Sequence, residues 1–135
     1  MKKHLTFSTL SLLLSAFALP GQAHHSFAMF DQTTKVTITG VISEIQWTNP
    51  HVWIMLDVPQ DDGTAVTWGV EFTSKVHLTR RGFPRNDIHV GDNATFTVSP
   101  YANGDPGGRF YTLQIEDGIT YCDPGARRAV AYCQQ

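Results

Sequence analysis

The chain is poor in charge, and in basic charge above all. Its 135 residues include 10 lysines and arginines against 12 aspartates and glutamates, which gives a formal net charge of −2. A protein that binds nucleic acid by neutralising phosphates needs a basic stripe. Only Arg80-Arg81 with Arg85 and the pair Arg127-Arg128 come near one, and we interpret both as solvated surface. The composition therefore argues against nucleic acid as a partner.

Long hydrophobic runs are also missing, apart from one short N-terminal segment. Residues 10–19 are mostly apolar, follow Lys2 and Lys3, and precede Pro20 and the small residue Ala23. A positive start, a short apolar core and small residues before a cleavage point are typical of a secretory signal peptide. We expect cleavage after Ala23 and a periplasmic or secreted mature chain with no membrane span.

Cysteine is nearly absent, since Cys122 and Cys133 are the only two. An exported chain enters an oxidising compartment, so a Cys122–Cys133 disulfide is the simplest interpretation. The alternative is a soft metal site made by two thiolates, but neither cysteine has a neighbouring histidine. The wide spacing excludes a redox Cys-x-x-Cys motif.

Catalytic signatures are absent too. The sequence has no Gly-x-Ser-x-Gly, no phosphate-binding loop and no His-Glu-x-x-His. Glu71 and Glu116 could resemble a carboxylate pair for acid–base chemistry, yet nothing in the sequence places them together. We therefore expect a non-enzymatic protein.

The patterns that remain predict an all-β domain with one short helix. Residues rich in β-branched side chains alternate with polar ones, and Thr73-Ser74 can cap a helix that ends near Gly82. Gly40 interrupts the first strand and suits a bulge or bend. The expected strands are residues 35–47, 51–58, 65–72, 94–99 and 109–116.

Three strands, one helix and two strands follow the order of a five-stranded OB-fold-like barrel. The alternative is a small open β-sandwich. About 110 residues remain after signal removal, which suits one compact domain. We expect a signal peptide at 1–23, the barrel at 24–121 and a C-terminal tail at 122–135 that carries the disulfide.

Two adjacent histidines follow the expected cleavage point. If His24 is the first mature residue, its α-amine and imidazole can chelate one metal ion, and copper is well suited to such nitrogen ligands. The reference pKa of an α-amine, about 7.7 to 8.0, lets a metal displace its proton near neutral pH. His25 and His51 are the candidate further ligands, whereas a mobile histidine-bearing end is the alternative.

A second candidate site surrounds a turn that is rich in aromatic residues. Trp47, Asn49, His51 and Trp53 lie within seven residues, and with Trp68 the tryptophans could form a stacking platform for an organic ligand. The alternative is that Trp47 and Trp68 pack in the core while Asn49 holds the turn.

Four short motifs carry a resemblance to a known family: Ala-His-His-Ser-Phe at 23–27, Trp-Thr-Asn-Pro-His-Val-Trp at 47–53, Gly-Asp at 91–92 and Asp-Gly at 117–118. With them the chain resembles a family of small exported bacterial proteins known as a domain of unknown function. The resemblance implies a periplasmic single-domain β-protein and brings no activity or catalytic residues. Cys122 and Cys133 are not part of its pattern. The start His24-His25 is also similar to exported copper proteins whose mature chains begin with histidine.

The leading hypothesis is therefore a periplasmic, non-enzymatic binding protein that captures copper through His24, helped by His25 and His51. The alternative hypothesis is an organic-ligand or protein-interaction module on the Trp47–Trp53 surface. A third is an oxidative copper enzyme.

Overall fold

A computed structural model describes residues 27–83, 85–116, 118 and 120–123. The expected signal peptide and Cys133 lie outside these residues. The described elements are a 3-10 turn η1 (Phe27–Met29), β1 (Val36–Gln46), β2 (Trp53–Pro59), β3 (Ala65–Glu71), α1 (Lys75–Arg80), a second turn η2 (Arg85–Asp87), β4 (Asn93–Pro100), β5 (Gly107–Ile115) and β6 (Thr120–Cys122).

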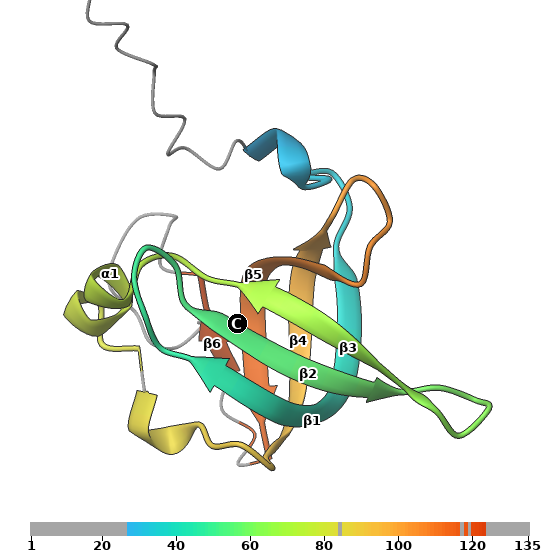
Figure 1. The fold of residues 1–135 in the computed structure, drawn as a ribbon. Helices are drawn as coiled ribbons and strands as arrows, with labels where there is room; N and C mark the ends of the chain where they lie inside the picture. The colour runs from blue at the N-terminus through green and yellow to red at the C-terminus, as the bar shows by residue number, and fades with distance from the viewer. Residues whose placement is uncertain (1–26, 84, 117, 119, 124–135) are drawn as a thin grey trace, which may run out of the picture.

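The five long strands close into a barrel, as Figure 1 shows. Their order is β3-β2-β1-β4-β5, with antiparallel neighbours throughout, and a parallel pairing of β3 with β5 completes the ring. The one α-helix among the described residues, α1, lies in the connection from β3 to β4. The predicted all-β, OB-fold-like barrel with one short helix is confirmed, and the open sandwich is wrong.

Alternation along the strands separates a core from an outer surface. Val52, Ile54 and Leu56 are almost fully buried, whereas Trp53 and Met55 point the opposite way and are half-buried. The second strand therefore has one face in the core and one on the outer surface. Inside the barrel the apolar side chains include a group of phenylalanines, of which Phe72 and Phe110 stack with ring centroids 4.1 Å apart.

Gly40 is the point at which β1 passes from one partner strand to the other. Gly40 pairs with Ala94 of β4, and the next residue, Val41, pairs both with Asn93 of β4 and with Asp57 of β2. A Cβ on Gly40 would collide with the backbone carbonyl of Asp57. The predicted bend is confirmed, but the bulge itself lies two residues further on, between Ile42 and Glu44.

Ser74 caps α1 as expected, since its hydroxyl accepts a hydrogen bond from the His77 backbone N–H at 3.3 Å. Among the described residues no helix has the length and apolar character needed to cross a membrane.

One short strand was not predicted from the sequence. β6 pairs with β5 beyond the closed ring, through Thr112↔Cys122 and Leu113↔Tyr121. Three residues carry too little alternation to be recognised as a strand. Cys122 thus ends a sheet strand, and the disulfide with Cys133 stays a prediction.

Candidate functional site

Three side chains lie in a row where the barrel closes. Glu71 ends β3 and pairs with Trp53 of β2 on one side and with Arg109 of β5 on the other. The chain neighbours of Glu71, Val70 and Phe72, are buried in the core. By strand alternation Glu71 therefore belongs to the outer surface of the barrel. We call Trp53, Glu71 and Arg109, together with His51 and Tyr101, the outer-face cluster.

Glu71 is buried although it lies on the outer surface. Only 4% of the residue is exposed. A buried carboxylate is unfavourable unless it is paired and hydrogen-bonded. His51 supplies the partner, because its Nδ1 contacts Glu71 Oε1 and its side chain remains 31% exposed. In the neutral form of an imidazole, a carboxylate at Nδ1 favours the tautomer that carries its proton on Nδ1.

Tyr101 covers the next pair of residues along the same surface. Gly69 and Gly107 are paired in β3 and β5, and a Cβ built on Gly107 would come within 2.6 Å of Tyr101 Cε2 and 2.8 Å of the Gly69 carbonyl oxygen. Glycine at this position therefore admits the Tyr101 ring. Burial raises the pKa of Tyr101, and the negative charges of Glu71 and Asp105 raise it further. The phenol stays protonated and can act as a hydrogen-bond donor.

Residues 27–35, which precede β1 and which we call the N-terminal segment, are attached next to this cluster. The Phe30 ring stacks on Tyr101 with centroids 5.2 Å apart, and the two residues form an isolated antiparallel bridge. Two backbone hydrogen bonds flank it, from Asp31 N to the Pro100 carbonyl at 2.8 Å and from Ala102 N to the Met29 carbonyl at 2.9 Å. In Figure 1 this segment, drawn in blue, lies beside the loop between β4 and β5.

The predicted tryptophan platform does not form. Trp47 and Trp68 pack against the core, and Trp47 stacks on Phe83 with centroids 6.1 Å apart. This packing agrees with the alternative interpretation of these two residues, and the part of Trp47 in ligand binding stays a prediction. Asn49 is exposed in the turn, where it precedes a cis peptide bond to Pro50. Of the four predicted ligand residues, the structure brings His51 and Trp53 together around Glu71.

The predicted metal ligands are only partly described. Among the described residues, no group of three or more histidine, cysteine, aspartate or glutamate side chains could hold a metal ion. His24 and His25 lie outside those residues, so the predicted set of His24, His25 and His51 stays a prediction. His77 and His89 are exposed.

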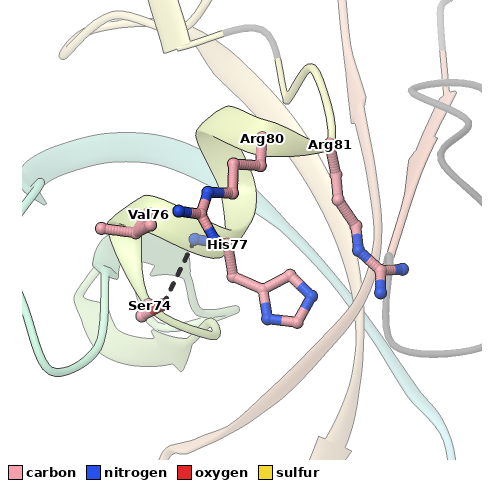
Figure 2. A pocket seen from close by; sticks show the side chains of 5 residues that line it. All are labelled: Ser74, Val76, His77, Arg80 and Arg81. Carbon is pink, nitrogen blue, oxygen red and sulfur yellow. Dashed lines mark hydrogen bonds between the residues drawn. The ribbon is translucent and has the colours of Figure 1, made fainter.

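A separate shallow hollow lies against α1, and Figure 2 shows the side chains that line it. Its residues are Ser74, Val76, His77, Arg80 and Arg81. The side chains of Arg80 and Arg81 point away from each other, so they do not converge on one point (Figure 2). This agrees with the expectation that Arg80-Arg81 is solvated surface.

Sequence reasoning missed most of the outer-face cluster. Glu71 was considered only as a partner for Glu116, which is exposed and instead accepts a hydrogen bond from Asn93 at 2.6 Å. Tyr101 and Arg109 were not singled out. The available signal was Gly-Val-Glu-Phe at residues 69–72, because one acidic residue between apolar neighbours in a predicted strand marks a charge that folding must accommodate.

Neither the curated proteins nor the solved structures include a match to this chain. The model of a family of unknown function, DUF6152, matches residues 12–110. That range contains all five residues of the outer-face cluster and also His24 and His25, whereas both cysteines lie beyond it. Because the match covers well over half of the chain, the protein belongs to the DUF6152 family of unknown function.

Proposed function

We propose that this protein is an exported, periplasmic and non-enzymatic binding protein that captures a copper ion. The ligands are the α-amine and imidazole of His24, with His25 and His51 as further donors. The proposal includes removal of residues 1–23 as a signal peptide and a Cys122–Cys133 disulfide in the mature protein.

The contact between His51 and Glu71 is the observation that carries the proposal. Metal-binding histidines usually donate their second ring N–H to a carboxylate or carbonyl, which fixes the ring and its tautomer. The buried Glu71 carboxylate at Nδ1 of His51 has this arrangement. In the neutral imidazole this contact favours the proton on Nδ1, and Nε2 is then the nitrogen that would bind a metal.

The attachment of the N-terminal segment supports the same site. Phe27 is the first described residue, and its ring lies over Arg109, the β5 neighbour of Glu71. His24 precedes Phe27 by three residues, and an extended chain of three residues spans about 10 Å. Adjacent strands are only about 4.8 Å apart. A mature chain that begins at His24 therefore has the length to approach His51.

Copper suits this donor set better than other divalent metals of the first transition series. Nitrogen ligands bind Cu(II) most tightly in the Irving–Williams order. The α-amine must lose its proton on binding, so affinity should rise with pH up to the amine pKa, about 8, and level off above it.

The position of the α-amine gives the sharpest test of the chelate. We would compare the mature chain that begins at His24 with one that carries a single added glycine before it. The added residue moves the α-amine away from the imidazole, and we expect tight Cu(II) binding to be abolished, as measured by competition with a chelator of known affinity. Retained affinity in the extended chain would contradict the proposal. His51→Ala should weaken binding without abolishing it.

A metal-free function at the same surface is the competing outcome. Trp53 is half-buried on the outer surface beside Glu71, so an organic ligand that stacks there would change its fluorescence. A fluorescence change in the absence of metal, lost in Trp53→Ala, would favour the organic-ligand module over copper capture.

A further inference from the structure

The loop between β4 and β5 contains the sequence Tyr-Ala-Asn-Gly-Asp at residues 101–105. Asn103 and Gly104 are both exposed, and Gly104 has a positive φ of 85°. Glycine is the one residue type without a side chain. The backbone nitrogen of Gly104 can therefore approach the side-chain carbon Cγ of Asn103 with little steric hindrance.

This approach leads to a general reaction of asparagine. The Gly104 nitrogen forms a bond to Asn103 Cγ and loses its proton, while the bond from Cγ to Nδ2 breaks and Nδ2 leaves as ammonia. The resulting five-membered succinimide takes up one water at either carbonyl and opens to aspartate or isoaspartate. An amide thus becomes a carboxylic acid, with one water consumed and one ammonia released.

The chain offers its own comparison, because all four of its asparagines are exposed. Asn49 is followed by proline, whose nitrogen has no proton to lose. Asn86 is followed by aspartate and Asn93 by alanine, so a side chain hinders the attacking nitrogen. Asn103 therefore has the most reactive sequence context.

Hydrogen bonds hold Asn103 and Gly104 in a closed turn that slows the reaction. The Gly104 N–H donates to the Tyr101 carbonyl at 3.2 Å. Both polar atoms of the Asn103 side chain bind Asp105, since Nδ2 donates to Oδ2 at 2.7 Å and Oδ1 accepts from the backbone N–H at 3.1 Å. These bonds engage the attacking nitrogen and fix the carboxamide. The reaction rate should therefore follow how often the turn opens.

The N-terminal segment holds this turn in place. Ala102 N donates to the Met29 carbonyl at 2.9 Å, and the Phe30 ring stacks on Tyr101, whose carbonyl accepts the Gly104 N–H. Phe30 is buried but does not belong to the hydrophobic cluster of the barrel core. Release of the segment should therefore loosen the turn and leave the barrel intact.

We propose that Asn103 is a site of spontaneous deamidation and that the attached N-terminal segment controls its rate. The inference does not depend on the proposed copper site. An aspartate at position 103 lacks the Nδ2 donor and places a second carboxylate against Asp105, whereas an isoaspartate lengthens the backbone by one carbon. Neither product can restore the closed turn, so the modification loosens the loop that carries Tyr101.

The first test is the rate of deamidation at mildly alkaline pH, followed by mass spectrometry of proteolytic peptides. In the folded wild type, Asn103 should be the first of the four asparagines to react. It should react about 100-fold faster when guanidinium chloride unfolds the chain. A folded protein that reacts at Asn86 or Asn93 as fast as at Asn103, or that does not react at Asn103 at all, would overturn the assignment.

Phe30→Ala tests the role of the N-terminal segment. It removes the ring that stacks on Tyr101 and should raise the rate in the folded protein about 10-fold. Phe30→Leu keeps an apolar side chain without the stacking and should react at an intermediate rate, which serves if the alanine variant folds poorly. Circular dichroism checks that the barrel is intact.

Phe27→Ala is the matched control, because Phe27 belongs to the same segment but is 57% exposed and lies over Arg109 rather than Tyr101. It should react as the wild type does. In guanidinium chloride all variants should react at one rate. Equal rates in folded Phe30→Ala, Phe30→Leu and wild type, or equal acceleration by Phe27→Ala and Phe30→Ala, would overturn the control by the Phe30 contact.

Discussion

Two parts of the outer surface of this barrel differ in character. On β1 and β4, threonines face each other across the strands, and their hydroxyls pair at 3.4 Å between Thr37 and Thr97 and at 2.9 Å between Thr39 and Thr95. These side chains are exposed or half-buried and carry no charge. Where β2, β3 and β5 meet, the outer-face cluster instead buries a carboxylate among aromatic and basic side chains.

The comparison separates side chains that the fold itself explains from side chains that the fold does not explain. Threonine suits a pleated, solvated strand surface, so the β1 and β4 pairs follow from strand propensity alone. A buried glutamate offers no such advantage, since a hydrophobic residue of similar size would often be equally stable or more stable there. The outer-face cluster is therefore the better place to look for function.

The largest expected effect comes from filling the space under Tyr101. Gly107→Ala would push a methyl group against both the Tyr101 ring and the Gly69 carbonyl oxygen. One contact is with backbone, so relief requires a shift of the strand. We expect a loss of about 3 kcal/mol in the free energy of unfolding, measured by urea denaturation.

Gly69→Ala is the matched control for that experiment. Gly69 pairs with Gly107, but a Cβ there would lie 3.5 Å from Trp53 Cζ3 and 3.6 Å from Met55 Sδ, which are ordinary contacts. Gly69→Ala should change the free energy of unfolding only slightly. Equal destabilisation by the two alanines would show that Tyr101 does not depend on the space above Gly107.

The next effect tests the contact between His51 and the buried Glu71 carboxylate. His51→Ala removes the imidazole that contacts the buried Glu71 carboxylate and should lower the free energy of unfolding by about 1–3 kcal/mol. Replacement of both residues by leucine should cost less than the single change, because no charge is left buried. A double variant that is less stable than His51→Ala would contradict this description of the pair.

A smaller effect should emerge only at alkaline pH. The pKa of Tyr101 is raised, mainly by burial, so above pH 10 the unfolded chain releases this proton before the folded protein does. The free energy of unfolding should therefore fall as pH rises from about 10 toward the folded pKa. Tyr101→Phe should reduce this pH dependence of the free energy of unfolding above pH 10. It should not change the pH dependence below pH 10. An unchanged slope in unfolding experiments across this range would contradict the raised pKa.

The smallest effect is expected on the threonine surface. Thr95→Val removes one hydroxyl of an exposed pair while keeping the branched shape, so stability should change by no more than about 0.5 kcal/mol. Copper affinity should not change at all. A loss of affinity in Thr95→Val would remove the distinction between the two surfaces.

The barrel could be predicted because each of its elements is encoded by residues that lie close together in the sequence. Alternation in each strand, the cap at Ser74 and the bend at Gly40 each have a signature within a few residues, and their order restricts the topology. Strand ends shifted by one or two residues, and β6 was missed because three residues hold too little pattern.

The outer-face cluster was mostly not predictable because it depends on register. Glu71 and Arg109 are 38 positions apart in the sequence and become neighbours only when β3 pairs with β5 in parallel. The position of Tyr101 depends on glycines in two different strands. By contrast, His51 and Trp53 were found because they share one turn and one strand surface.

Copper capture is tested most directly by a Cu(II) titration of a chain that begins at His24, followed by electron paramagnetic resonance. Copper capture through His24, His25 and His51 should give one ion per chain, with at least three nitrogen ligands, of which one is lost in His51→Ala. Weak or heterogeneous binding, or a ligand set that His51→Ala leaves unchanged, would contradict it.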